Sequence, residues 1–259
     1  MAEGRVTRGT TGVNRLRRID RWIATLPALR RTDDPLVVDL GYGASATTAL
    51  ELHERLSKVR ADVEVIGIEI EPERVRVASL AARPGVSFRQ GGFEVPLPAG
   101  RRATIIRTLN VLRQYDESEV AAAWALMLTR LQPGGVLVEG TCNEIGRVCS
   151  WIALTSDGPQ SFTVSLRLDD LDKPSIVAER LPKALIHRNV PGERIHEFLK
   201  SLDRHWQVNA PLGVYGPSQR FLATAQGMRA DGWPVLGTRT RWRLGEISVA
   251  WGSVAPAVE

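Results

Sequence analysis

The sequence predicts an α/β fold, in which a mostly parallel sheet is covered by helices. Two observations lead to this expectation. Between residues 36 and 140, short runs rich in Val, Ile and Leu alternate with helix-like segments, which is the pattern of βαβ units. After residue 141 the rhythm changes to two strand-like segments and then to further helices. The chain is therefore expected to add a C-terminal α+β elaboration to the parallel sheet.

The expected elements of the parallel part follow in regular order. Strands are expected at 36–40, 63–69, 86–90, 103–109 and 136–140, and helices at 45–58, 72–82 and 117–131. Pro72 suits the first turn of its helix, and Pro133-Gly134-Gly135 stops the third helix.

The later elements are less regular. Strands at 151–155 and 161–168 are joined by Ser156-Asp157-Gly158-Pro159, which is a hairpin signal. Helices are expected at 175–206 and 217–230, and a final strand at 243–251.

The composition is that of an ordinary globular chain, with 259 residues, 43% hydrophobic and 24% charged. Three parts are expected: an arm at 1–31, a core at 32–170 and an elaboration at 171–259 that is specific for the substrate and packs on the core. The longest apolar run, Val120–Leu128, is far below the ~20 residues of a membrane span. No secretory signal is visible, and two cysteines make no disulfide framework. A cytoplasmic protein without a membrane partner is expected, and its oligomeric state is left open.

The positive charge is concentrated at the N-terminus. Residues 1–31 hold eight arginines and two acids, so the rest of the chain is nearly neutral. Such an arm suits nucleic acid, an anionic substrate or an acidic partner; the alternative is a solvated helix in a chain with only four lysines. Leu16, Ile19, Ile23 and Leu26 recur at helical spacing, which predicts an amphipathic helix from about Val13 that packs on the core.

The most informative stretch is Val37–Ala46, which reads VVDLGYGASA. It places G-x-G-x-x-A at a strand-to-helix turn, where a ligand can approach bare backbone. Asp39 precedes the first glycine by two residues, and Glu69 ends the next strand, where a carboxylate can accept both hydroxyls of a ribose. A site for NAD, and a turn whose glycines are needed only sterically, are the alternatives.

With these residues the chain resembles the class I S-adenosylmethionine-dependent methyltransferases. Asp39–Gly43 is similar to their first motif and Glu69 to their acidic ribose ligand; Gly91-Gly92-Phe93-Glu94 resembles the adenine-binding turn, and Leu131–Val138 the L-x-P-G-G turn. The match covers about residues 32–168. It implies a doubly wound, mostly parallel seven-stranded sheet with a terminal antiparallel hairpin, and S-adenosylmethionine as cofactor.

The resemblance also implies a set of cofactor-binding residues: Asp39, Gly41, Tyr42, Gly43, Glu69, Ile70, Gly92 and Phe93. An acid at position 39 suits the ammonium of S-adenosylmethionine and opposes a phosphate. Gly92 departs from the family, in which an acid often stands here, so backbone atoms of Gly92 and Phe93 are expected to replace it, with Phe93 or Ile70 flanking the adenine.

Three residues are candidates for catalysis. In doubly wound sheets the acceptor lies outside the carboxyl ends of the strands, which nominates Asn110 to position it and Tyr115 to orient or deprotonate it. His187 lies among cations near a helix end and is expected at the substrate entrance; for all three, a purely local structural role is the alternative. Cys142 resembles in its position the cysteine nucleophile of RNA 5-methylcytosine methyltransferases; the alternative is that it is only a small buried residue. No metal-ligand spacing is present.

The predicted function is transfer of a methyl group from S-adenosylmethionine to an O, N or C nucleophile of a small molecule. The alternatives are an RNA-directed methyltransferase that uses the arginine-rich arm, and a catalytically silent binding protein. Residues 14–18 of the arm are expected to border the active-site mouth, with Asn14 and Arg18 at the two ends of that stretch.

Overall fold

The computed structural model describes residues 2–257. The chain forms two compact units: residues 1–146 with 154–158, and residues 147–153 with 159–259. The three parts expected from the sequence, 1–31, 32–170 and 171–259, stay a prediction; in the structure the arm belongs to the first unit, and the second unit already includes residues 147–153 and 159–170. Among the described residues, no helix has both the length and the apolar character that crossing a membrane requires.

The first unit is built on five parallel strands, as the sequence predicts. They are β1 (Leu36–Leu40), β2 (Glu64–Glu69), β3 (Val86–Gln90), β4 (Ala103–Leu109) and β5 (Leu131–Cys142). Their order is β3-β2-β1-β4-β5. The order reverses between β1 and β4, which is where doubly wound sheets bind ligands.

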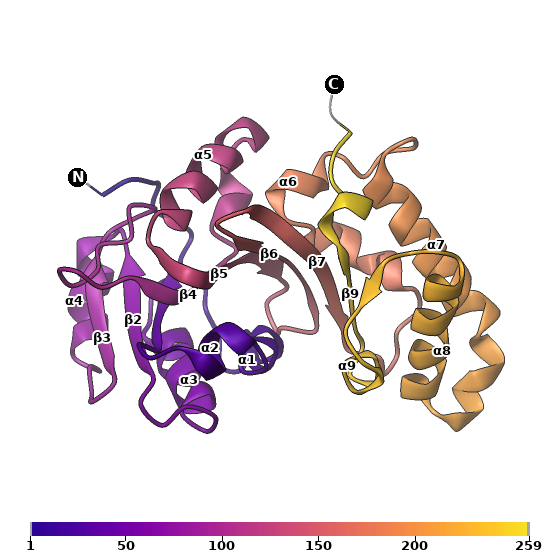
Figure 1. The fold of residues 1–259 in the computed structure, drawn as a ribbon, viewed down its shortest axis with the longest axis horizontal. Coiled ribbons are helices and arrows are strands. Elements are labelled where there is room, and N and C mark those ends of the chain that lie inside the picture. Colours follow the sequence, from indigo (N-terminus) through magenta and orange to yellow (C-terminus); the bar gives the residue numbers. More distant parts are fainter. Residues whose placement is uncertain (1, 258–259) are drawn as a thin grey trace. The chain divides into compact units, whose positions relative to one another are not determined.

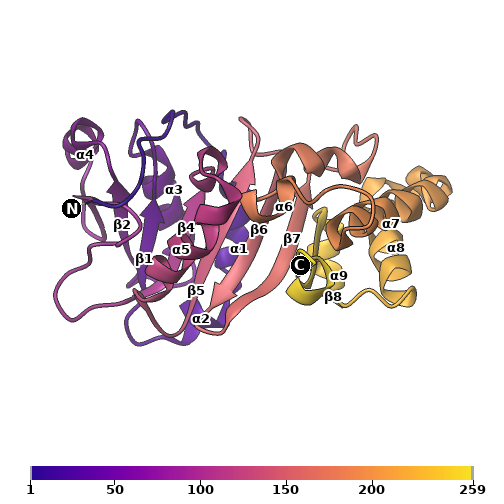
Figure 2. The same cartoon turned by 90° about the horizontal axis from the view of Figure 1, so that it is seen from above.

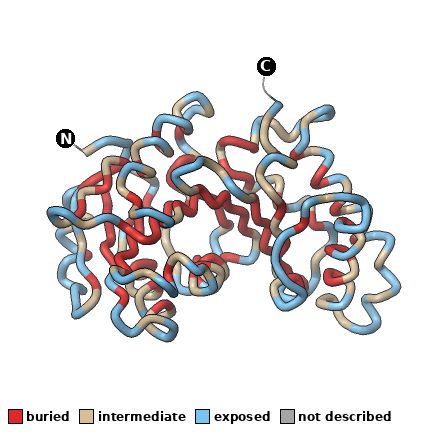
Figure 3. Tube along the Cα trace, in the orientation of Figure 1, coloured by how far each residue is buried: buried red, intermediate tan, exposed pale blue. Residues whose placement is uncertain are grey.

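Helices cover both faces of this sheet. They are α1 (Arg17–Ile23), α2 (Pro27–Arg31), α3 (Thr47–Leu56), α4 (Pro72–Ser79), η1 (Leu112–Gln114) and α5 (Glu117–Leu128). In Figure 1, α1, α2 and α3 lie below the strands and α5 lies above them. Helix α5 begins with a capping box between Asp116 and Glu119. The buried positions follow the strands (Figure 3), and every residue of β1 and β4 is buried.

Strand β5 is longer than expected, because Pro133-Gly134-Gly135 lies inside it. The register against β4 shifts at this point: Ala103 pairs with Leu131, and Ile105 pairs with Val136. Gly134 has a φ of 75°, which lets the extra residues form a bulge. The Pro-Gly-Gly segment therefore bends a strand, and α5 ends earlier, at Leu128.

The second unit carries antiparallel strands and the remaining helices. The strand order is β6 (Val148–Thr155), β7 (Gly158–Leu166), β9 (Glu246–Ala250) and β8 (Val235–Leu236), and β9 is antiparallel to both of its neighbours. Its helices are η2 (Pro174–Arg180), α6 (Lys183–Ile186), α7 (Arg194–Val208), η3 (Ala210–Tyr215), α8 (Pro217–Ala230), α9 (Arg239–Arg243) and η4 (Trp251–Ser253). Figure 2 shows α7 and α8 side by side.

The prediction of one helix over 175–206 is wrong. Pro182 and Pro191-Gly192 divide the segment into η2, α6 and α7, and Gly192 has a φ of 94° that no helix contains. The helix predicted at 217–230 is confirmed as α8. The prediction of an α/β fold with a parallel sheet followed by antiparallel strands is confirmed, although the described residues form nine strands, β1 to β9, and not the seven expected.

The N-terminal arm contains a shorter helix than its periodicity predicts. Asn14 has a φ of 62°, a left-handed conformation that interrupts a right-handed helix, so α1 begins at Arg17. Ile19 and Ile23 have no exposed surface, and α1 contacts α3. The arm is therefore packed onto the first unit through its apolar side.

Candidate functional site

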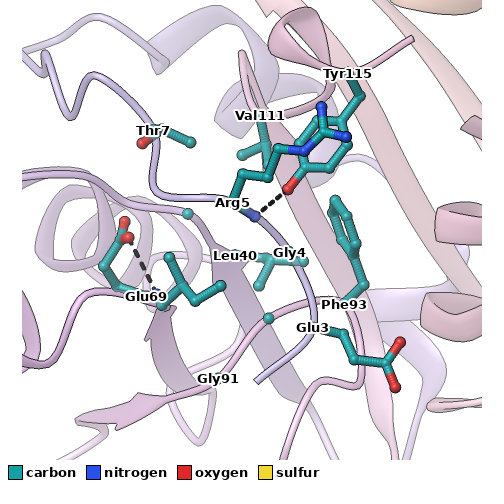
Figure 4. Close-up of a pocket in the computed structure, with 13 residues that line it drawn as sticks. Glu3, Gly4, Arg5, Thr7, Leu40, Glu69, Gly91, Phe93, Val111 and Tyr115 are labelled. Carbon is teal, nitrogen blue, oxygen red and sulfur yellow. Dashed lines mark hydrogen bonds between the residues drawn. The ribbon is translucent and has the colours of Figure 1, made fainter. Parts of the chain in front are cut away.

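A pocket lies at the carboxyl ends of the first strands of the parallel sheet. Its cavity volume is about 20 Å³. It is lined by residues that follow β1 to β4 and by the beginning of the arm: Glu3, Gly4, Arg5, Thr7, Leu40, Gly41, Glu69, Ile70, Gly91, Gly92, Phe93, Val111 and Tyr115. Figure 4 shows the side chains of Glu69, Phe93 and Tyr115 around it. Gly41, Glu69, Ile70, Gly92, Phe93 and Tyr115 of the sequence-predicted site residues are thus brought together.

The turn after β1 needs its glycines. Gly41 has a φ of 73°, and a Cβ there would lie 2.4 Å from Cγ2 of Val111. Gly43 has a φ of 86° and donates its N–H to Oε2 of Glu69 at 3.0 Å. Both positions use the conformational freedom that glycine alone has.

The carboxylate of Glu69 is buried and links the turn to the end of β2. It is 1% exposed, and its Oε1 accepts the N–H of Ile70 at 3.1 Å. The guanidinium of Arg74 lies 3.5 Å from Oε1. The Glu69 carboxylate is thus held in place by the backbone N–H groups of Gly43 and Ile70 and by the guanidinium of Arg74.

Asp39 lies outside the pocket lining, in a buried ion network. Arg107 of β4 donates Nε to Oδ1 of Asp39 at 3.0 Å and approaches Oδ2 to 2.7 Å with Nη2. The other guanidinium nitrogen of Arg107 pairs with Asp20 of α1, and Thr48 donates its hydroxyl to Asp39 at 2.7 Å. Burial lowers the pKa of Arg107, but the two carboxylates outweigh this effect and raise it above its usual value.

Sequence reasoning missed Arg107 and Asp20. Arg107 is the single charged residue of β4, and Asp20 lies 87 residues before it. No spacing rule connects residues so far apart. The only signal was a charged residue in the middle of a strand expected to be buried on both faces, which requires a partner.

Tyr42 is not among the residues that line the pocket. Its ring packs edge-on against Phe88 with centroids 5.3 Å apart, and its hydroxyl donates to the carbonyl of Arg74 at 3.4 Å. Together with Ala46 and Ala78 it forms a small buried apolar cluster. This position indicates that Tyr42 helps α3 and α4 to pack together.

The turn after β3 contributes backbone, an aromatic ring and an acid. The ring of Phe93 lies 5.2 Å from that of Tyr115. Glu94 accepts the N–H of Gly92 at 3.0 Å and the N–H of Glu3 at 2.8 Å. An acid is therefore present in this turn although position 92 is glycine.

The candidate catalytic residues lie in different places. Tyr115 lines the pocket, whereas Asn110 accepts the N–H of Cys142 at 3.0 Å and donates to its Sγ at 3.3 Å. Asn110 also has a φ of 63°, and Cys142 is fully buried. His187 belongs to the second unit, where it ends α6 and its Nε2 lies 3.3 Å from Nζ of Lys183. Within residues 2–257, no group of three or more His, Cys, Asp or Glu side chains is arranged to hold a metal ion.

The start of the arm is a part of the site that the sequence did not indicate. The backbone carbonyl of Glu3 accepts the N–H of Phe93 at 2.8 Å, and that of Gly9 accepts the N–H of Ala44 at 3.0 Å. Between them, Arg5 donates its N–H to the hydroxyl of Tyr115, and its guanidinium lies 4.9 Å from the centre of that ring (Figure 4). We call residues 3–9 the N-terminal strap.

Comparisons with known proteins give likenesses of fold. No family model matches the sequence, and no curated protein does. Among solved structures, human N-acetylserotonin methyltransferase in complex with SAM aligns at 20% identity over 48% of this chain and 33% of its own, with a TM-score of 0.37. CalS10, an amino pentose methyltransferase from Micromonospora echinaspora, aligns at 22% identity over 62% and 73%, with a TM-score of 0.36. A pericyclic reaction enzyme aligns at 16% identity over 46% and 31%, with a TM-score of 0.37.

Sequence identities of 16–22% indicate a likeness of fold and nothing more. The chain spans about a third of the length of the human enzyme. The neighbours include S-adenosylmethionine-dependent methyltransferases, the family that the sequence motifs resemble.

Proposed function

We propose that the chain binds S-adenosylmethionine in the pocket of the first unit and transfers its methyl group to a small molecule. The observation that supports this proposal is the convergence of three separate motifs on one pocket. Gly41, Glu69 and Phe93 lie at or just after the ends of three different strands, and all three line it. A sterically required turn alone would not explain why a buried carboxylate and an aromatic ring face the same space.

The lining residues fit the chemistry of this cofactor. Glu69 would accept the ribose hydroxyls, Ile70 and Phe93 would flank the adenine, and the N–H groups of the turns would hold its polar edges. When bound, S-adenosylmethionine supplies a methyl group on a positively charged sulfur. The work left to the chain is to align an acceptor and to exclude water.

Tyr115 is the residue best placed to orient the acceptor. Burial raises the pKa of its hydroxyl above the ordinary value of a tyrosine, an effect that the hydrogen bond and charge of Arg5 oppose. The hydroxyl is therefore protonated near neutral pH and acts as a hydrogen-bonding group. Its proposed role is to position the acceptor.

The alternative of an RNA-directed enzyme gains no support from the arm. Arg15 is buried and donates to the carbonyls of Thr10, Cys142 and Asn143. Arg5 pairs with Glu119 at 2.7 Å. Two of the arginines that could contact phosphates are thus engaged within the chain, and a small molecule remains the proposed acceptor.

Calorimetry with S-adenosylmethionine and S-adenosylhomocysteine tests the cofactor. We expect Glu69→Gln to weaken binding by about 10- to 100-fold, because a hydrogen bond to a charged group contributes roughly 1.5–3 kcal/mol. The matched control is Glu54→Gln, in an exposed side chain of α3, which should bind like the parent. Thermal unfolding of each variant verifies that it is folded.

The acceptor is tested with labelled S-adenosylmethionine and a fractionated cell extract. Label in a small-molecule fraction supports the proposal, and label in RNA favours the alternative. Absence of binding by either cofactor form at high micromolar concentration, in the parent chain and in the Gly9→Ala variant described below, would refute the proposed function.

A further inference from the structure

The N-terminal strap, residues 3–9, lies on the groups that the proposed cofactor would use. The carbonyl of Glu3 takes the N–H of Phe93 at 2.8 Å, and the carbonyl of Gly9 takes the N–H of Ala44 at 3.0 Å. These two N–H groups belong to the turn after β3 and to the glycine turn after β1. Because a backbone N–H is a single donor, neither can serve the strap and a ligand fully at the same time.

The strap also approaches the glycines of the site more closely than any side chain would permit. A Cβ at position 92 would lie 1.9 Å from the carbonyl oxygen of Glu3, and one at position 43 would lie 2.9 Å from that of Gly9. Close backbone approach is the property for which the glycine turn was identified as a ligand site. In this structure the group that makes the approach is the chain itself.

The remaining space is small for the proposed cofactor. With the strap in place the pocket has a cavity volume of about 20 Å³, far below the ~300–1,000 Å³ of typical small-molecule sites. Four residues of the strap form part of its wall. Removal of the strap would enlarge the space and release both N–H groups.

The strap is held by contacts that can be broken locally. Gly4, Arg5 and Val6 are exposed, and Val6 has half of its surface in solvent. The strap is attached by hydrogen bonds of its main chain, some of them to the side chains of Glu94, Gln114 and Arg74. It is also attached by the contacts of Arg5 with Tyr115 and Glu119, and it has little buried apolar surface. Segments with little buried apolar surface are those that open most easily.

We propose that the strap is a built-in competitor of the cofactor: it occupies the cleft in the free protein and must leave for S-adenosylmethionine to bind. This inference rests on the proposed function, because it names the regulation of the same site. It differs from a lid, which closes over a bound cofactor and strengthens its binding. With a competitor, the apparent Kd equals the intrinsic Kd divided by the fraction of molecules whose strap is released.

Two matched glycine variants of the full-length chain test the proposal. Gly9 has a φ of 71°, a left-handed conformation that glycine adopts readily and alanine rarely, whereas a Cβ there would meet only the movable end of the Arg74 side chain. Gly9→Ala is therefore expected to shift the equilibrium between the seated and the released strap about tenfold toward the released state. Gly12→Ala is the control, because Gly12 is in the same arm and its Cβ would make only an ordinary contact, 3.8 Å from the carbonyl oxygen of Glu144.

We expect Gly9→Ala to bind S-adenosylmethionine about tenfold more tightly than the parent in calorimetry, and Gly12→Ala to bind like the parent. Hydrogen exchange gives a second readout without ligand. The amide of Ala44 should exchange faster in Gly9→Ala, and it should become protected again when the cofactor is added.

Three results would overturn the inference. If affinity is unchanged or weaker in a Gly9→Ala variant whose Ala44 amide exchanges faster, the strap is not a competitor, and the proposed function stands. If the exchange of Ala44 is the same in the parent and in a Gly4→Ala/Gly9→Ala double variant, the strap does not protect that amide. If no variant binds the cofactor, the proposed function fails and this inference fails with it.

Discussion

At the scale of single residues, two acids that carry similar signals in the sequence have different positions. Glu69 was predictable, because an acid that ends the strand after a glycine turn lies at the ligand edge of the sheet. Asp39 lies one strand away, yet its carboxylate is bound by Arg107 and Thr48. Its role depends on a partner 68 residues later in the chain, and no local pattern indicates such a partner.

This difference predicts separate effects of substitution. Asp39→Asn removes one of the charges that neutralise a fully buried guanidinium, so we expect a loss of about 3 kcal/mol in the free energy of unfolding. The affinity for S-adenosylmethionine, measured well below the melting temperature, should stay within about threefold of the parent. Urea unfolding and calorimetry on the same preparation give both numbers. If Asp39→Asn kept the stability of the parent but lost binding, Asp39 would instead be a cofactor-binding residue.

At the scale of elements, periodicity predicted the helices and strands whose apolar side chains are buried locally. It missed the features that depend on hydrogen bonds to backbone far away in the sequence. The strands of the parallel sheet and α8 follow from apolar patterns. The bulge in β5 and the strap do not, since both are defined by hydrogen bonds to segments far away in the sequence. In the strap these bonds are made by main-chain atoms, which every residue has, so its sequence carries no signal. The helix of the arm was predicted because its apolar side is local.

Helix α1 is therefore expected to stabilise the first unit. Ile19 has no exposed surface, so Ile19→Ala should lower the free energy of unfolding by about 2–5 kcal/mol. Val13 lies in the same arm and is 74% exposed, so Val13→Ala should stay within about 0.5 kcal/mol of the parent. Guanidinium unfolding of both variants makes the comparison. Equal midpoints would show that the arm is not part of the folding unit.

At the scale of the whole molecule, the proposed cofactor site lies entirely in the first unit. His187 and the aromatic pairs Phe162–Phe198 and Phe198–Trp233 lie in the second unit, for which the sequence matched no known motif. The role of His187 in substrate binding remains a prediction. The first unit also contains a buried acid that the proposed function does not use, Glu139 of β5, whose Oε2 has no hydrogen-bond partner among the described residues.

Glu139 should make the stability of the chain depend on pH. Burial raises the pKa of its carboxyl to about 8, whereas in the unfolded chain a glutamate titrates near ~4.3. Between these values the folded chain holds a proton that the unfolded chain has released, so the contribution of Glu139 to stability is fully present below about pH 4.3 and is lost as the pH rises toward 8. The slope is about 1.4 kcal/mol per pH unit at most. Glu139→Gln keeps the shape of the neutral acid and should flatten the fall of the melting temperature between pH 5 and 8, while Glu54→Gln should leave it unchanged. The same pH dependence in Glu139→Gln and in the parent would show that this carboxyl is not the group that titrates.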